Sequence, residues 1–132
     1  MQPKTNTRNA PWIGVDLDRT LAHYVTHDHG YDATRIGEPL WPMVHRIQHW
    51  IDAGTKVKIF TARVSGFDLS SVDGKAAKAI VVDAIQNWLE NACKLPRLEV
   101  TNEKDYRTIE IWDDIAVQMH PNTGLPIVGP NR

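Results

Sequence analysis

The sequence has little cysteine, no long apolar run and almost no excess of charge. Its 132 residues include one cysteine, Cys93, which excludes an intrachain disulfide and predicts a reducing compartment, the cytoplasm. No apolar stretch reaches the roughly 18 residues that a membrane-spanning helix needs, and residues 1–9 lack the apolar core of a signal peptide. The net charge of −1 gives no electrostatic signature of strong non-specific nucleic-acid binding. We therefore expect a cytoplasmic protein without a membrane partner.

What is present indicates one globular domain. The chain is 42% hydrophobic and 23% charged, as is typical of folded proteins, and a chain of this length buries roughly two-thirds of its unfolded surface. Residues 1–10 are polar and show no period, which predicts a loose N-terminal tail. Residues 121–132 are rich in proline and glycine, which predicts a turn-rich C-terminal tail on the surface. The folded domain is expected over residues 11–120.

Short apolar runs alternate with amphipathic segments along this domain. The run at 12–18 predicts a strand buried on both faces, and residues 56–61 predict a second strand. Helices are expected over 42–54 and 73–92, where apolar residues recur at 3.6-residue spacing. The apolar positions of the two helices are Met43, Val44, Ile47, Trp50 and Ile51, then Ala77, Ile80, Val81, Ala84, Ile85, Trp88, Leu89 and Ala92. Three more strands are expected over 98–101, 109–112 and 116–119.

The alternation of strands and helices predicts an α/β fold. We expect a Rossmann-like, doubly wound sheet of five mainly parallel strands, with helices on both faces. Residues 21–41 show no helical period and follow the first strand, so they predict a short flap.

Reactive side chains follow four of the predicted strands. They are Asp16 and Asp18, Thr61, Lys104, and Asp113 and Asp114. Because ligands bind at the carboxyl ends of parallel strands, we expect these side chains to meet at one edge of the sheet.

Oxygen ligands dominate this set. Asp16 and Asp18 are two residues apart, so both side chains point to the same side of an extended segment. Two close carboxylates repel each other unless a cation lies between them or one holds a proton. With carboxylates from a second strand and no thiolate, Mg²⁺ is the expected ion. Lys104 and Thr61 add the positive charge and the hydroxyl that suit a phosphoryl group, which a carboxylate could attack as a nucleophile.

Four segments resemble the motifs of the haloacid dehalogenase superfamily. The sequence Asp-Leu-Asp-Arg-Thr-Leu at 16–21 resembles the first motif, Asp-x-Asp-x-Thr, and Lys-Ile-Phe-Thr at 58–61 resembles the second. Lys104 matches the lysine of the third motif, and Ile-Trp-Asp-Asp at 111–114 matches the Asp-Asp form of the fourth. The motifs occur in the family's order over residues 12–119.

The resemblance implies a magnesium-dependent phosphatase with two carboxylates in different roles. Asp16 would be the nucleophile. Asp18 would protonate the leaving oxygen and then activate water, while its main-chain carbonyl helps to hold the metal. Asp113 would bind the metal, with Asp114 assisting directly or through water. An acid at position 18 favours a phosphatase over a dehalogenase, because dehalogenases of the family lack it.

The remaining residues of the site would face the substrate. By the same resemblance, Thr61 and Lys104 would bind the transferring phosphoryl group. Arg19 occupies a position that is often small in the family, and it would either turn outward or add a phosphate contact. Arg63 lies just past the second motif and either contacts substrate or forms a surface salt bridge, and the flap residue His23 is a candidate substrate contact.

The resemblance also implies an open site. Residues 21–41 leave room for a flap hairpin but not for a cap domain, and residues 105–112 are too few for a second cap. Family members without a cap act on large substrates, including polynucleotide ends, or use a neighbouring subunit as a lid. The substrate would be a nucleotide, a sugar phosphate or the terminal phosphate of a nucleic acid.

Other readings of the same residues remain open at this stage. The pairs His27/His29 and His45/His49 could bind zinc, but no cysteine is near either pair. A non-catalytic phosphate-binding or partner-binding module on the same fold is the main alternative to an enzyme, and Asp18 argues against it. A phosphorylation-receiver domain would need its acceptor aspartate on a middle strand, which the segment 58–61 does not offer.

Overall fold

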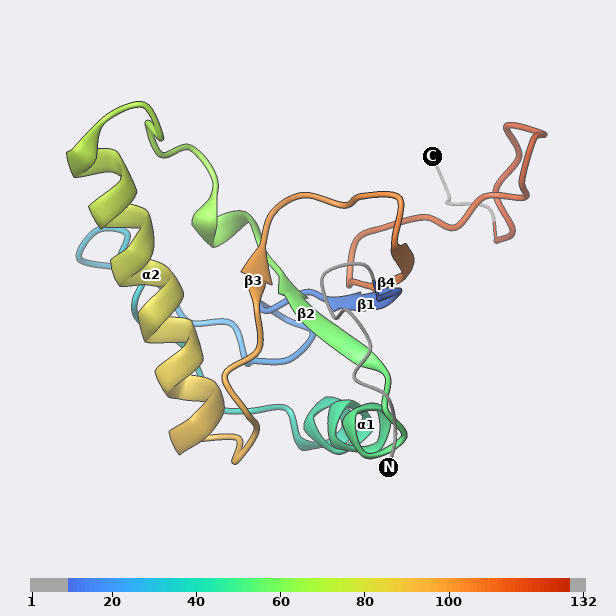
Figure 1. The fold of residues 1–132 in the computed structure, drawn as a ribbon, viewed down its shortest axis with the longest axis horizontal. Helices are drawn as coiled ribbons and strands as arrows, with labels where there is room; N and C mark the ends of the chain where they lie inside the picture. The colour runs from blue at the N-terminus through green and yellow to red at the C-terminus, as the bar shows by residue number, and fades with distance from the viewer. Residues whose placement is uncertain (1–9, 129–132) are drawn as a thin grey trace.

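A parallel sheet of four strands forms the centre of the protein. The computed structural model describes residues 10–128, so most of the predicted N-terminal tail and the last four residues lie outside the described part. The strands lie in the order β3-β2-β1-β4 (Figure 1). They are β1 (Trp12–Val15), β2 (Lys56–Phe60), β3 (Val100–Thr101) and β4 (Thr108–Trp112). The predicted α/β class with a parallel sheet is confirmed.

The central strand β1 sets where the other strands end. All of its residues are buried, and Val15 pairs with Ile59 on one side and with Trp112 on the other. Gly14 suits this close packing, since a Cβ there would lie 2.8 Å from the Cδ1 atom of Ile111, whose side chain would have to shift. The chain segments that follow β1, β2 and β4 therefore start at the same edge of the sheet.

The first helix, α1 (Trp41–Asp52), confirms the predicted amphipathic segment. Pro42 lies in its first turn, where a missing backbone N–H costs nothing. Val44 and Ile47 are buried against the sheet. After the helix, Gly54 adopts a φ of 85°, a left-handed conformation that glycine accepts without strain.

The second helix, α2 (Val72–Asn91), begins at a serine cap, since Ser71 Oγ accepts a hydrogen bond of 2.9 Å from the Gly74 N–H. Its buried face is narrower than the sequence predicts, because Ile80 is 62% exposed. The buried residues are Val81, Ile85 and Leu89. Successive residues of a helix point in different directions, so Ile80 faces solvent although the adjacent Val81 faces the core.

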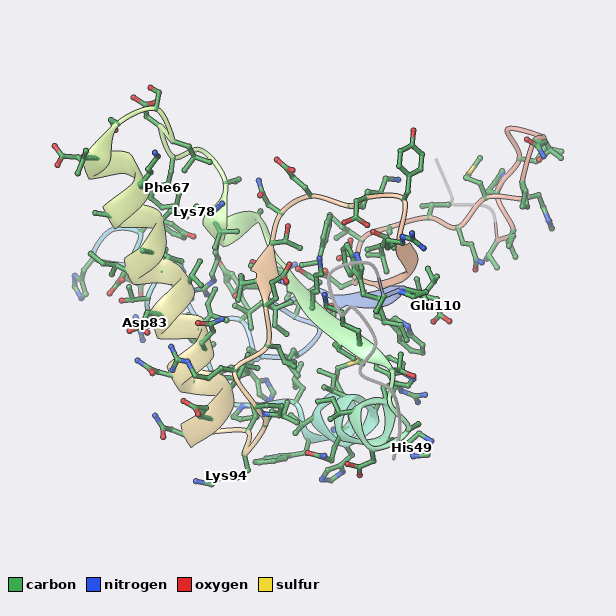
Figure 2. The ribbon with its side chains drawn as sticks, viewed as in Figure 1. His49, Phe67, Lys78, Asp83, Lys94 and Glu110 are labelled. Atoms are coloured by element: carbon green, nitrogen blue, oxygen red, sulfur yellow. The ribbon has the colours of Figure 1, made fainter. Side chains whose placement is uncertain are left out.

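The outer side of α2 carries charged residues. Figure 2 labels Asp83 there, and its carboxylate binds Arg97 of the following connection at 2.6 Å. Glu90 binds the same guanidinium at 3.0 Å. Within the described residues, no helix has the length and apolarity that crossing a bilayer requires.

Both helices share one core with a single face of the sheet. Side chains alternate along a strand, and the face that carries Ile13 and Val15 of β1 also carries Val57 and Ile59 of β2. These residues form one buried cluster with the apolar faces of α1 and α2. The described connection between β3 and β4 contains no helix. The predicted helices on both faces are therefore not observed in the described part of the chain.

The prediction of a fifth strand over residues 116–119 is wrong. The chain leaves the sheet after β4 and runs away from it, as the red segment of Figure 1 shows. Met119 forms one isolated antiparallel bridge, with Pro126, and Val117 is 42% exposed. Alternating apolar residues fit a strand, but a strand forms only where a neighbouring strand accepts its backbone hydrogen bonds.

The flap that follows β1 contains no described helix or strand, and no cap domain is inserted there. Its base is closed by backbone hydrogen bonds from Leu40 to Leu21, 2.8 Å, and from His23 to Glu38, 2.9 Å. The indole of Trp88 on α2 donates a hydrogen bond of 3.0 Å to the Gly37 carbonyl.

Candidate functional site

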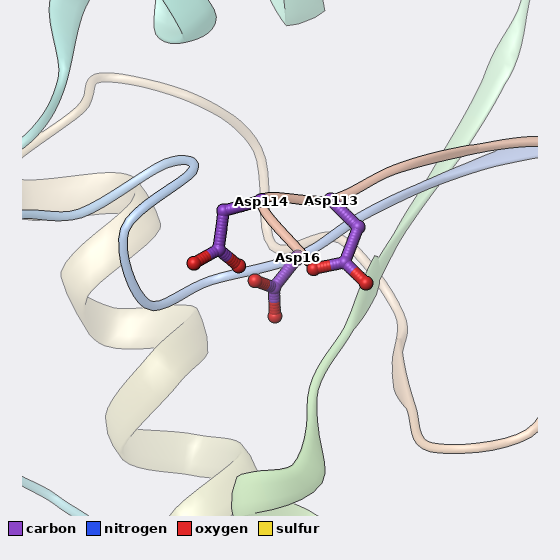
Figure 3. Close-up of side chains that lie close together, drawn as sticks. All are labelled: Asp16, Asp113 and Asp114. Atoms are coloured by element: carbon purple, nitrogen blue, oxygen red, sulfur yellow. The ribbon is translucent and has the colours of Figure 1, made fainter. Parts of the chain in front are cut away.

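Three carboxylates meet at the edge of the sheet where the parallel strands end. Asp16 follows β1, and Asp113 and Asp114 follow the adjacent β4. The backbone N–H of Asp16 donates to the Trp112 carbonyl at 2.9 Å, which aligns the two strand ends. Each residue offers one carboxylate oxygen, and these oxygens lie within 4.8 Å of one another (Figure 3).

The crowding of these carboxylates changes the titration of Asp16. Burial raises the pKa of Asp16 to about 7, with further contributions from a hydrogen bond with Asp114 and from the charge of Asp113. The hydroxyl of Thr20 donates a hydrogen bond of 3.3 Å to the same carboxylate. A divalent cation would relieve this repulsion, and a donor set made only of oxygen fits Mg²⁺.

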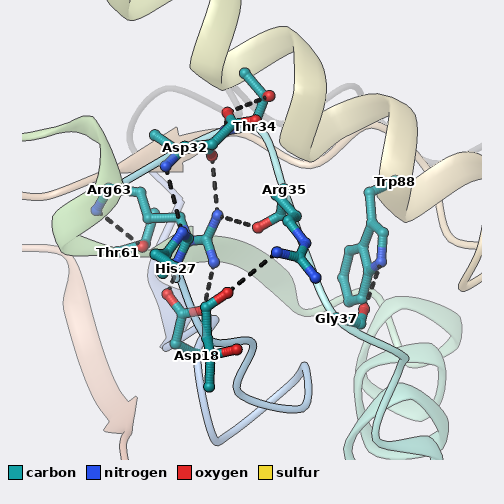
Figure 4. Close-up of polar contacts among 11 residues, drawn as sticks. Asp18, His27, Asp32, Thr34, Arg35, Gly37, Thr61, Arg63 and Trp88 are labelled. Atoms are coloured by element: carbon teal, nitrogen blue, oxygen red, sulfur yellow. Dashed lines mark hydrogen bonds and ion pairs between the residues drawn. The ribbon is translucent and has the colours of Figure 1, made fainter. Parts of the chain in front are cut away.

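The Asp18 side chain binds Arg63 and is not part of the cluster of Asp16, Asp113 and Asp114. Its two oxygens accept hydrogen bonds of 2.8 and 2.7 Å from Nε and Nη2 of Arg63 (Figure 4). The Arg63 side chain is 4% exposed and that of Asp18 is 34% exposed. Burial lowers the pKa of Arg63, and its pairing with Asp18 more than offsets this, so the net shift is upward. Arg63, which the sequence suggested as a substrate contact or a surface salt bridge, forms a buried ion pair with Asp18.

Thr61 lies at the carboxyl end of β2 and is buried. Its hydroxyl accepts a hydrogen bond of 3.1 Å from the Arg63 N–H at the start of the short 3-10 helix η2 (Ala62–Val64). Its own N–H donates to the Thr101 carbonyl at 2.9 Å, so the ends of β2 and β3 are adjacent. Thr61 is therefore at the predicted sheet edge, and it also caps the turn that carries Arg63.

Lys104 lies in the connection from β3 to β4 and is exposed. Its ammonium group pairs with no carboxylate in the described part of the chain. It borders a hollow of about 720 Å³ beside β4, which is lined by residues 104–106 and 108–111 and by none of the three carboxylates. The role of Lys104 in binding a phosphoryl group stays a prediction.

Arg19 and His23 lie where the chain enters the flap. Arg19 has a φ of 68°, an uncommon conformation outside glycine, and it is held by a hydrogen bond of 2.8 Å from its N–H to the Ala22 carbonyl. Its guanidinium lies 4.7 Å from the centre of the Tyr24 ring, which the sequence reading did not single out. His23 is exposed. The substrate roles of Arg19 and His23 stay predictions.

The histidine pairs do not form a metal site with other residues of the described chain. His45 and His49 lie on the exposed side of α1 (His49 is labelled in Figure 2). The Nδ1 atom of His27 accepts a hydrogen bond of 3.3 Å from the Asp32 N–H. Within the described residues, three potential ligands come together only in the cluster of Asp16, Asp113 and Asp114. Elsewhere, burial raises the pKa of Cys93 to about 12, in keeping with a packing role.

Sequence reasoning missed two features of this site. The hydroxyl of Thr20 could have been assigned, because it belongs to the Asp-x-Asp-x-Thr pattern itself. The pairing of Asp18 with Arg63 had no such signal, since the two residues are separated by 45 positions and meet only in the folded chain. The site has to be interpreted from its own geometry, because comparison with family models, curated proteins and solved structures finds no match to this chain.

Proposed function

We propose that the protein is a Mg²⁺-dependent phosphomonoesterase that works through an aspartyl-phosphate intermediate. The observation that carries this proposal is the group of Asp16, Asp113 and Asp114, whose oxygens lie within 4.8 Å of one another at the ends of two adjacent parallel strands. Three close carboxylates repel one another unless a cation lies between them or one of them holds a proton. A cation beside a carboxylate also favours phosphoryl transfer.

In this mechanism Asp16 and Asp18 act in sequence. An Asp16 oxygen attacks phosphorus while the bond from phosphorus to the leaving oxygen breaks, and Asp18 gives the leaving oxygen its proton. Water then attacks the phosphorus of the aspartyl phosphate, and Asp18 accepts the proton of that water. The P–O bond to Asp16 breaks, which restores the carboxylate and releases phosphate.

The other residues would bind and neutralise the substrate. Asp16, Asp113 and Asp114, with the main-chain carbonyl of Asp18, would hold Mg²⁺, which supplies positive charge against the repulsion between a carboxylate and a phosphate. Thr61 would donate its hydroxyl to the phosphoryl oxygens, and Lys104 would place its ammonium beside them.

The family and substrate belong to the same proposal. The strand order with β1 central is compatible with a Rossmann-like member of the haloacid dehalogenase superfamily that has a flap and no cap. A site without a cap accommodates a nucleotide, a sugar phosphate or the phosphorylated end of a nucleic acid, or is covered by a second subunit. The cytoplasm, a reducing compartment in which a lone cysteine stays reduced, is the proposed compartment.

One observation favours a second candidate, a non-catalytic module that binds phosphate or a partner. Both oxygens of Asp18 accept hydrogen bonds from Arg63. A carboxylate can have this structural role without taking part in proton transfer. The two candidates differ in whether phosphate is released from a bound monoester.

Phosphate release from a panel of substrates tests the proposal. The panel contains nucleotides, sugar phosphates, 3′- and 5′-phosphorylated oligonucleotides and p-nitrophenyl phosphate, each with Mg²⁺ and with excess chelator. We expect Mg²⁺-dependent release that is abolished by Asp16→Asn, because a neutral amide does not attack phosphorus. Release from no substrate, or equal release by Asp16→Asn, would contradict the proposal. Mg²⁺-dependent binding of phosphate without turnover would identify the binding module.

A further inference from the structure

Arg63 is a buried arginine whose donors join two separate parts of the chain. Nε and Nη2 bind both oxygens of Asp18 after β1. Nη1 donates to two main-chain carbonyls of the flap, those of Ala33 at 2.9 Å and Arg35 at 2.6 Å (Figure 4). A guanidinium on a side chain that is only 4% exposed is costly to bury unless its donors are satisfied. Its contacts to Asp18 and to the flap are therefore expected to form and break together.

Arg63 is the polar anchor of the outer part of the flap, residues 24–36, which also packs Ala33 and Ile36 against the hydrophobic core. Inside the segment, Arg35 Nη1 donates to the Thr26 carbonyl at 3.1 Å. Within the described residues, the hydrogen bonds that tie 24–36 to the rest of the protein all come from Arg63. The outer flap and the carboxylate of Asp18 are thus bound to the same side chain from opposite sides.

We propose that Arg63 is a positioning residue that fixes the Asp18 carboxylate and makes its position depend on the flap. The catalytic meaning of this coupling rests on the proposed function, whereas the coupling itself does not. A bidentate pair holds the plane of the carboxylate in one orientation. When the flap moves to admit a substrate, the carbonyls of Ala33 and Arg35 move away from Nη1, and the guanidinium loses the contacts that orient it. The position of the flap therefore determines when Asp18 is aligned with a leaving group.

Amide hydrogen exchange of residues 24–36 tests the coupling without any substrate. Arg63→Gln and Asp18→Asn should each speed exchange there by about tenfold or more, because each removes charge-assisted hydrogen bonds from the network. The double variant should add little to either single variant, since both act through the same network. Arg97→Gln is the matched control: it removes an arginine that pairs with Asp83 on α2 and should leave exchange in 24–36 unchanged.

Unchanged exchange in Asp18→Asn would overturn the coupling, and so would simple addition in the double variant. Circular dichroism establishes that each variant is folded. Should Arg63→Gln fail to fold, the conservative Arg63→Lys takes its place, because lysine keeps the charge but lacks the planar fork that binds both oxygens. With this variant exchange in 24–36 should again rise, and wild-type exchange would overturn the coupling.

Kinetics of Arg63→Lys separate positioning from a merely structural role. For an alkyl phosphate, kcat should fall by about 10- to 100-fold, less than the 10²- to 10⁴-fold that an acid–base group itself contributes, because Asp18 is still present, while KM stays within roughly threefold. For p-nitrophenyl phosphate, whose leaving group scarcely needs a proton, the loss should be clearly smaller. Equal losses for both substrates would overturn the positioning role. A wild-type protein that hydrolyses no phosphomonoester refutes the proposed function instead, and hydrogen exchange still decides the coupling.

Discussion

Asp16 is a partly buried carboxylate that lies beside two others, Asp113 and Asp114. Burial and its two carboxylate neighbours raise its pKa from 3.8 to about 7. In the metal-free protein the folded state therefore binds more protons than the unfolded state between pH 4 and pH 7. The free energy of unfolding must fall as the pH rises through this range, and the stabilisation is lost above pH 7.

This effect predicts a difference between wild type and Asp16→Asn in excess chelator. Wild type should lose stability between pH 5 and pH 8 relative to Asp16→Asn, because asparagine carries no proton to release. Urea unfolding of both proteins at the two pH values measures the difference. If the variant loses as much stability as wild type over this range, the raised pKa of Asp16 is not the cause.

The second carboxylate of the site has its own prediction. Asp18→Asn keeps the shape of the side chain but removes the proton donor, so turnover of an alkyl phosphate should fall by about 10²- to 10⁴-fold. For p-nitrophenyl phosphate the loss should be smaller. Steady-state rates with both substrates in wild type and variant measure the effect, and equal losses would mean that Asp18 is not the general acid for bond cleavage.

At the scale of elements, α2 offers a matched pair of isoleucines. Ile85 is fully buried against the sheet, whereas Ile80 is 62% exposed on the same helix. Ile85→Ala should cost about 2–5 kcal/mol of unfolding free energy, since it removes buried methyl groups and leaves a cavity. Ile80→Ala should cost less than about 0.5 kcal/mol. Denaturant unfolding of the two variants measures these free energies. A similar cost for both would support the wider buried face that the periodicity predicts, which includes Ile80.

The sequence is a good guide to elements whose signal is local. The helix periods and the short buried runs predict α1, α2 and all four observed strands to within a few residues. Residues 116–119 show why the prediction of a fifth strand is wrong. A short apolar run is compatible with a strand, but a strand forms only where a neighbouring strand accepts its backbone hydrogen bonds. The strand ends likewise predict the meeting of Asp16 with Asp113 and Asp114. The Asp18–Arg63 pair depends on how β1, η2 and the flap pack, which no local pattern encodes.

At the scale of the whole molecule, a metal bound between β1 and β4 would stabilise the folded chain. Its ligands come from segments that are separated in the unfolded state, so binding favours the native state by RT ln(1 + [Mg²⁺]/Kd), about 2.7 kcal/mol at one hundred times Kd. A thermal melt of wild type should shift upward with Mg²⁺, whereas Asp113→Asn should shift much less. An equal shift in both proteins would place the ion elsewhere.

The pairing of β1 with β4 also determines when Asp16 meets Asp113 and Asp114 during folding. The Trp12 indole donates a hydrogen bond of 3.0 Å to Asp105, a residue 93 positions further along the chain. Contacts at such separation close large loops, which costs chain entropy and slows their formation. During synthesis Asp16 is added long before Asp113 and Asp114. The three carboxylates come together only after β4 has paired with β1. We therefore expect that a nascent chain forms the proposed metal site only after β4 has docked against β1.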